Sequence, residues 1–278
     1  MEIQVLIENK TYKGDLLAEH GLSLFIEANG KSILYDFGWS DILIKNAEKM
    51  NIDLKKVEFA VVSHGHMDHT GGMYSFSKIN NHAPVYIHKN AFKQSYTLKN
   101  GKLSEEHVGI KLSISQYEEL QDRLIFTDGV TWLGDDIVVS GTIPPIKGFE
   151  PISKYYVKDE KMGLVLDQME HEQFLAIRDK AKGGVYVFSG CSHTGVTSCV
   201  KYAQELFRGE SIKALIAGMH LYGSETAVIK KTIDEILSFD IQIFLPVHCT
   251  GIEATCELKT RMKDKCIILN TGNSYKFE

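Results

Sequence analysis

Short apolar runs separated by polar, glycine-containing turns predict strands at several places in the chain. Alternation at residues 3–8 predicts a first strand, and residues 22–27 and 32–36 predict a hairpin closed at Asn29-Gly30, a dipeptide typical of two-residue turns. Helical spacing predicts a helix at 40–50. Further strands are predicted at residues 56–62, 84–88, 131–140, 163–167, 184–189, 214–218, 241–246 and 267–270. This pattern predicts an α/β (α+β) fold.

The predicted strand at 56–62 leads into the run Ser63-His64-Gly65-His66-Met67-Asp68-His69-Thr70-Gly71-Gly72. Imidazole nitrogens and carboxylate oxygens are the usual zinc ligands of reactive sites. His64 and His66 lie two residues apart, so an extended segment points both rings the same way. Asp68 and His69 follow on a tightening turn and can face a second point, which suits two ions roughly 3.5–4 Å apart. The alternative is a polar loop that is merely rich in histidine.

Three later predicted strands each end in a histidine, namely His193, His220 and His248. The carboxyl ends of such strands are where ligands bind in α/β sheets. We expect His193 to join His64 and His66 on the first ion, and His248 to join Asp68 and His69 on the second. Asp68 and His220 are the catalytic candidates, since Asp68 can orient or deprotonate a water and His220 can bind substrate or donate a proton. In the alternative, His220 is the ligand and His193 has the other function.

Composition narrows the class of protein. The chain has 278 residues, a formal charge of -5 and a pI near 6.1, which disfavours a nucleic-acid partner. Its five cysteines do not suggest a disulfide framework, its acidic start is unlike a signal peptide, and no apolar run approaches a membrane span. We expect one domain over residues 1–278, a cytoplasmic location and a small-molecule substrate, with the oligomeric state left open.

The run H-x-H-x-D-H at residues 64–69 resembles the signature of the metallo-β-lactamase superfamily. Further segments resemble one subgroup, named after the dihydropterin–ribofuranosylaminobenzene phosphate synthase of methanopterin synthesis. These segments are Glu19-His20-Gly21-Leu22-Ser23, Ser189-Gly190-Cys191-Ser192-His193, Gly218-Met219-His220-Leu221 and Pro246-Val247-His248-Cys249-Thr250-Gly251. The resemblance implies a four-layer αββα sandwich and two divalent ions. Zinc is expected, with manganese, iron or magnesium as alternatives.

The resemblance also bears on residues beside the ligands. It implies that Asp36 supports the metal site without binding metal, whereas a turn aspartate bonded to local backbone is the alternative. Glu19 and His20 are expected to support the ligands or contact substrate, or else to lie in a solvated loop. Cys191 stands where many members carry an aspartate that bridges two metals. It is either a thiolate ligand or a small buried residue, which leaves metal number and identity open.

The polar segment at residues 90–125 is expected to be an insertion that covers the substrate, although its aromatic residues can equally anchor it to the core. The resemblance implies an enzyme that joins a dihydropterin methyl diphosphate to a ribofuranosylaminobenzene phosphate. The alternatives are a metallo-hydrolase of a phosphodiester, lactone or thioester, and a non-catalytic metal-binding or redox module.

Overall fold

A computed structural model describes residues 1–99, 102–148, 154–159, 161–181 and 183–277, and the described strands form three sheets. The first sheet has the order β17-β1-β2-β3-β4-β5-β8. It contains β1 (Glu2–Ile7), β2 (Ser23–Ala28), β3 (Lys31–Tyr35), β4 (Phe59–Val61), β5 (Val85–His88), β8 (Leu124–Thr127) and β17 (Ser274–Lys276). The predicted hairpin at Asn29-Gly30 is confirmed, because Ala28 pairs with Lys31 across the turn.

The second sheet has the order β16-β15-β14-β13-β10-β9. It contains β9 (Thr131–Trp132), β10 (Ile137–Val139), β13 (Leu175–Arg178), β14 (Val185–Ser189), β15 (Ile212–Ala217) and β16 (Ile243–Pro246). The strands β14, β15 and β16 run parallel. Their carboxyl ends therefore meet at one edge of the sheet, as the sequence predicts for the three histidines.

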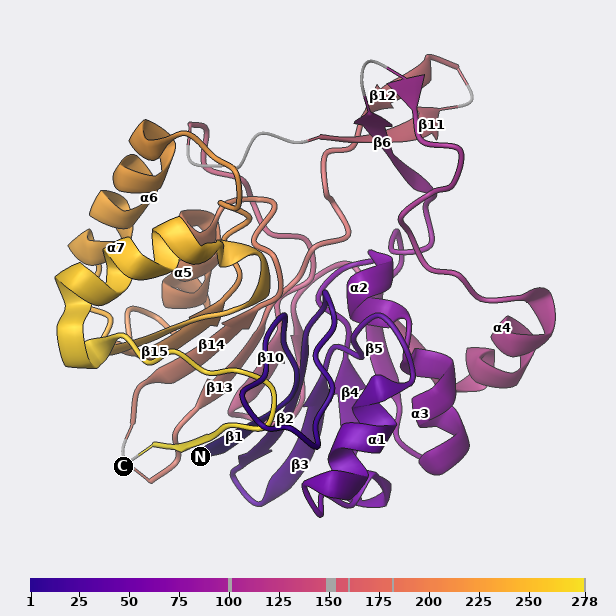
Figure 1. The fold of residues 1–278 in the computed structure, drawn as a ribbon, viewed down its shortest axis with the longest axis horizontal. Helices are drawn as coiled ribbons and strands as arrows, with labels where there is room; N and C mark the ends of the chain where they lie inside the picture. The colour runs from indigo at the N-terminus through magenta and orange to yellow at the C-terminus, as the bar shows by residue number, and fades with distance from the viewer. Residues whose placement is uncertain (100–101, 149–153, 160, 182, 278) are drawn as a thin grey trace.

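Helices cover the outer face of each large sheet (Figure 1). The helices α1 (Ile42–Lys49) and α3 (Met73–Ile79) share a buried cluster with the first sheet. The helices α5 (Val196–Leu206), α6 (Thr226–Ser238) and α7 (Ile252–Met262) share another with the second. A third cluster joins the facing sides of the two sheets, with Tyr35 and Phe188 at its centre. These layers confirm the αββα sandwich.

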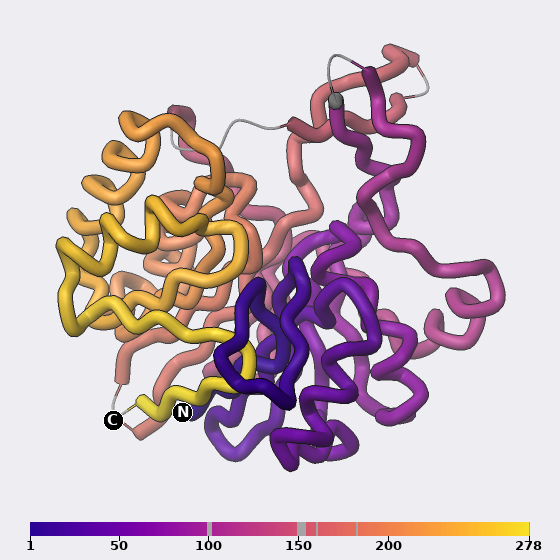
Figure 2. The backbone as a smooth tube through the Cα atoms, viewed as in Figure 1, coloured from indigo at the N-terminus to yellow at the C-terminus, as the bar shows by residue number. Residues whose placement is uncertain are grey.

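A small third sheet stands apart from the sandwich, at the top of the view (Figures 1 and 2). It has the order β12-β11-β6-β7 and contains β6 (Ser95–Lys99), β7 (Lys102–Leu103), β11 (Tyr155–Asp159) and β12 (Gly163–Leu166). The sequence predicted β12 but not the other three strands. The predicted insertion supplies β6, β7 and α4 (Ile114–Leu120), and its expected turn at Asn100-Gly101 lies outside the described residues.

The predicted strand at 267–270 is wrong. The Ile267 amide donates one hydrogen bond to the Phe244 carbonyl at the edge of the second sheet, and the chain then turns between Asn270 and Asn273. It crosses to the first sheet, where β17 pairs with β1 and the two termini lie near each other (Figure 2).

Short helical turns complete the described elements: α2 (Met67–Thr70), η1 (Leu54–Lys56), η2 (Gln121–Arg123), η3 (His248–Thr250) and η4 (Lys263–Lys265). In the described part of the chain, no helix has the length and apolar character needed to cross a bilayer.

Candidate metal centre

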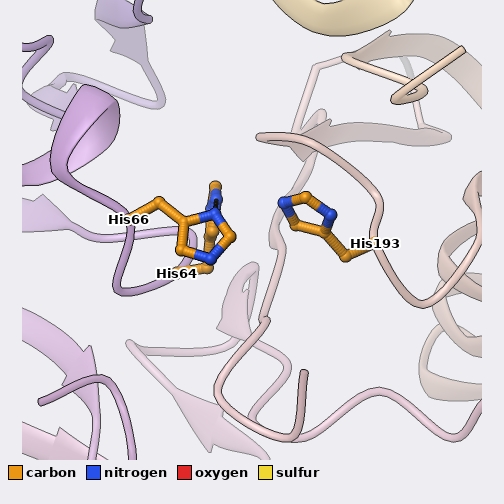
Figure 3. A group of neighbouring side chains, drawn as sticks. All are labelled: His64, His66 and His193. Atoms are coloured by element: carbon orange, nitrogen blue, oxygen red, sulfur yellow. Dashed lines mark hydrogen bonds between the residues drawn. The ribbon is translucent and has the colours of Figure 1, made fainter. Parts of the chain in front are cut away.

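The histidines predicted for the first ion come together at the facing edges of the two large sheets. His64 and His66 follow β4, and His193 follows β14 and points toward them from the opposite sheet (Figure 3). One donor atom from each of the three lies within 4.8 Å of the others. All three side chains are buried.

Asp36 follows β3, and its carboxylate holds Ser63 and His69 of the histidine run in place. Its carboxylate accepts hydrogen bonds from the Ser63 amide and the Ser63 hydroxyl, both at 2.7 Å. Since that hydroxyl donates to Asp36, the His64 Nδ1–H must donate to the Ser63 oxygen at 2.9 Å. His69 Nδ1–H donates to Asp36 at 2.6 Å. Both histidines therefore present Nε2 to the interior of the site.

The electrostatics of the first group favour neutral imidazoles. Burial, with the neighbouring ring of His171, lowers the pKa of His66 to about 3. Burial and the surrounding histidines likewise hold the pKa values of His64 and His193 well below the usual range. The Nε2 atoms of His66 and His193 are buried and have no hydrogen-bond partner among the described residues. Neutral, unpartnered imidazole nitrogens are what a divalent ion requires as ligands.

The donors predicted for the second ion surround the Asp68 carboxylate. One oxygen of Asp68 lies 3.2 Å from His248 Nε2 and 3.8 Å from His69 Nε2. His20 Nε2 lies 3.3 Å from the same oxygen. Burial alone would raise the pKa of Asp68, but the charge of His69 and the contacts with His20 and His248 outweigh burial and hold that pKa well below its usual range.

His69 lies between two carboxylates, those of Asp36 and Asp68. Burial would lower its pKa, but Asp36 and Asp68 outweigh burial and raise the pKa to about 9. These two carboxylates therefore favour positive charge at this ring, and a metal ion on Nε2 would supply such charge as well as a proton does.

Cys191 is close to His69 and also belongs to a further group of possible metal donors, with His220 and Cys249. Its sulfur is 3.2 Å from His69 Nε2, and Cys191, His220 and Cys249 offer donor atoms within 4.8 Å of one another. The Cys249 sulfur accepts a hydrogen bond from the His220 amide. His220 and His248 both have positive φ, 47° and 50°, a conformation that costs a non-glycine residue on the order of 1–3 kcal/mol and is typical of functional sites.

Glu19 lies away from the ligands. Its carboxylate accepts hydrogen bonds from the amides of Trp39 and Ser40 and from the Ser40 hydroxyl, at 2.9, 3.0 and 2.7 Å. It therefore braces the loop after β3, whereas its neighbour His20 faces the metal centre.

Several supporting residues were not found from the sequence. The buried carboxylate of Glu172 accepts from the amides of His193 and Thr194, both at 2.7 Å, and so fixes the corner that carries His193. His171 Nδ1 accepts from the Gly65 amide, between the predicted ligands His64 and His66. The histidine and two acids in Glu170-His171-Glu172 were an available signal.

A cavity of about 890 Å³ opens above the centre. Tyr155 at the start of β11 places its ring 4.3 Å from that of His66, so the small third sheet reaches the rim of the site. The cavity lining includes the candidate donors His20, His66, Asp68, His193, His220 and His248. It also includes Lys10, Tyr12, Lys154, Tyr222 and Ile268. No residue of 90–125 is in the described lining.

The chain belongs to the metallo-β-lactamase superfamily, whose family model matches residues 17–156. Two relatives from Methanocaldococcus jannaschii match nearly the whole chain. One, an uncharacterized protein, is 31% identical over 92% of this chain and 93% of its own length. The other is 7,8-dihydropterin-6-methyl-4-(beta-D-ribofuranosyl)-aminobenzene-5'-phosphate synthase, 30% identical over 96% of this chain and 92% of its own. The predicted superfamily and subgroup resemblance is thereby confirmed.

Solved structures agree on the fold. A metal-dependent hydrolase of the β-lactamase superfamily superposes with a TM-score of 0.83 at 28% identity, over 100% of this chain and 99% of that one. Zinc-bound PqqB from Methylobacterium extorquens has a TM-score of 0.56 at 11% identity, over 100% of both chains. The second likeness concerns the fold alone.

Proposed function

We propose that this protein is a binuclear metal-dependent enzyme that acts on a phosphorylated small molecule. The observation that carries the proposal is the set of convergent, buried imidazole nitrogens without partners, at the floor of an open cavity. His64, His66 and His193 would hold one ion, and Asp68, His69 and His248 the other. Zinc suits this nitrogen-rich donor set, and manganese, iron or magnesium are alternatives.

When bound, paired divalent ions polarise a phosphoryl or carbonyl oxygen and neutralise the charge of a leaving phosphate. The chain's own residues supply the rest. Asp68 orients the attacking group or accepts its proton, and His220, which lines the cavity, donates a proton or a hydrogen bond to substrate. Lys10 and Lys154 also line the cavity, and their positive charge favours an anionic substrate.

The reaction we favour resembles that of the synthase relative. A dihydropterin methyl diphosphate is joined through its methyl carbon to a ribofuranosylaminobenzene phosphate, and diphosphate leaves. Support comes from the match over 96% of this chain. The second candidate is hydrolysis of a phosphodiester, lactone or thioester. It is favoured by the whole-chain superposition, TM-score 0.83, on a structure described as a metal-dependent hydrolase.

The test combines metal analysis with a substrate panel. We expect one to two divalent ions per chain after reconstitution with zinc or manganese. We also expect diphosphate release that depends on both synthase substrates and stops with a chelator. Hydrolysis of panel esters without the second substrate would favour the hydrolase. Well under one ion per chain after reconstitution would refute the metal centre itself.

A further inference from the structure

The His20 side chain stands directly beside the proposed second ion site. His20 Nε2 and His248 Nε2 lie 3.3 and 3.2 Å from the same Asp68 oxygen, and the two rings are 4.7 Å apart between centroids. One donor atom from each of these three residues lies within 4.8 Å of the other two. Two imidazole nitrogens and a carboxylate oxygen thus converge on one point.

Asn9, which follows β1, settles which nitrogen of His248 carries a proton. Its Nδ2 donates to the His248 carbonyl at 3.1 Å, and its Oδ1 accepts from the Gly21 amide at 3.2 Å. The amide orientation is fixed by these two bonds, so Oδ1 is an acceptor. His248 Nδ1, at 2.9 Å from that oxygen, must therefore be the donor. This leaves the lone pair of the neutral ring on Nε2, facing Asp68.

The backbone around His20 is held in place even though its side chain is 60% exposed. Glu19 binds the loop after β3, the Gly21 amide binds Asn9, and the Leu22 amide binds the Asp68 carbonyl. A Cβ atom on Gly21 would lie 2.6 Å from that carbonyl oxygen, so only glycine allows this approach. The His20 segment is therefore packed against the backbone of Asp68.

Two imidazole nitrogens that lie 3.2–3.3 Å from one carboxylate oxygen are held there by positive charge, which either protons on the rings or one shared metal ion can supply. We propose that His20 is a protein ligand of the divalent ion held by Asp68 and His248, and that Asn9 is the positioning residue for this site. This inference rests on the proposed metal centre and adds a ligand to it. The nitrogen and oxygen donors suit zinc or manganese.

The experiment measures the two stepwise affinities for Zn²⁺ and Co²⁺ in the full chain by competition with a chromophoric chelator, together with the Co²⁺ visible spectrum. His20→Ala should weaken the second ion at least tenfold, leave the first unchanged and alter the spectrum of the second Co²⁺. Asn9→Ala should weaken the second ion roughly 10–100-fold, the usual effect of losing such a support. Asn9→Asp keeps an acceptor for His248 Nδ1 but loses the donor to the His248 carbonyl, so its affinity should lie between those of Asn9→Ala and the wild type.

The matched control is His82→Ala, because His82 is an exposed histidine outside the site. Its two affinities should equal those of the wild type. Wild-type affinity for both ions in His20→Ala would overturn the inference, and lost turnover with unchanged affinity would show that His20 acts on substrate instead. Failure of the wild type to bind any ion would refute the proposed function as a whole. If Asn9→Ala does not fold, the His20→Ala measurement still decides.

Discussion

Three histidines of the centre share one arrangement, in which Nδ1 is bound by the protein and Nε2 faces the site. The partners of Nδ1 are the Ser63 hydroxyl for His64, Asp36 for His69 and Asn9 for His248. Holding a ring by one nitrogen fixes its tautomer and orientation, and this is how metal ligands are usually prepared. This arrangement supports the proposed metal centre.

His193, His248 and His220 can be distinguished by the effect of removing each ring. We predict that His193→Ala weakens the first ion and that His248→Ala empties mainly the second, because each leaves an ion short of a donor. His220→Ala should keep the ions that the other histidines bind and lose roughly 10²–10⁴-fold in turnover, the usual effect of removing a general acid or base. Metal stoichiometry and turnover measured on the same preparations check this.

His82→Ala is again a suitable control for these variants, since His82 is exposed and does not line the cavity. This variant should change neither the metal stoichiometry nor the turnover. Full occupancy in His193→Ala together with loss of the first ion in His220→Ala would mean that the two histidines have exchanged roles.

The sequence predicted the histidine groups that the fold brings together, but not the residues that support them. The histidine run and the strand-end histidines could be recognised because each follows an apolar run that marks a strand end. Asn9 also follows a predicted strand, but nothing local shows that it bonds to His248, which is far away in the chain. The acidic run at Glu170-His171-Glu172 likewise does not show that Glu172 holds the amide of His193. Periodicity reports on local structure, whereas contacts of this kind depend on how the two sheets face each other.

At the scale of single elements, the C-terminal end of β5 supplies a test that does not involve the metal. His88 Nδ1 accepts from the Asn90 amide at 3.1 Å, and its Nε2 lies 2.9 Å from the Thr142 hydroxyl oxygen, whose proton goes to the Glu170 carbonyl. The folded protein therefore holds a neutral ring. Burial, with the nearby His171, lowers the pKa of His88 to about 4.

In the unfolded chain, His88 has the ordinary histidine pKa of about 6.5. On acidification, the unfolded state therefore takes up a proton at His88 before the folded state does. We predict that His88 contributes fully to the free energy of unfolding above about pH 6.5 and that this contribution is lost as the pH falls toward 4. Urea unfolding across this range should show a shallower decline in unfolding free energy for His88→Gln than for the wild type. Parallel pH profiles for the two proteins would contradict the prediction.

The strands differ in how well the sequence predicted them. β14 and β15 are continuous apolar runs buried on both faces, and both were predicted. β11 and β6 carry mixed residues such as Lys158 and Thr97 because their sheet lies outside the main core. Their pairing brings together segments far apart in the chain, which local patterns cannot show.

We predict that the hairpin of β6 and β7 affects substrate choice through β11. β6 pairs with β11 at Tyr96 and Tyr156, and the neighbouring Tyr155 covers His66. Replacing residues 98–103 with a short turn should change relative activity across a panel of phosphoesters and leave metal content intact. Loss of metal together with an unfolded circular dichroism spectrum would mean that the segment is structural.

At the scale of the whole molecule, the centre joins the two sheets. His64 and Asp68 follow a strand of the first sheet, whereas His193 and His248 follow strands of the second. The N-terminal segment is also bonded across this junction, because Glu8 accepts from the His248 amide at 2.8 Å. Any ion bound here would therefore be held by both halves of the sandwich at once.

This arrangement predicts that metal stabilises the fold itself. The native state holds the donors together, whereas the unfolded chain separates them, so an ion binds the folded form far better. At free metal a hundredfold above its dissociation constant, the gain is about 2.7 kcal/mol, which corresponds to several degrees in Tm for a chain of this size. Calorimetry of the chelator-treated protein, with zinc titrated back, should show Tm rising with the logarithm of free zinc. The rise should be smaller in His193→Ala and His248→Ala and unchanged in His82→Ala. A Tm that does not respond to zinc would contradict a centre shared between the two sheets.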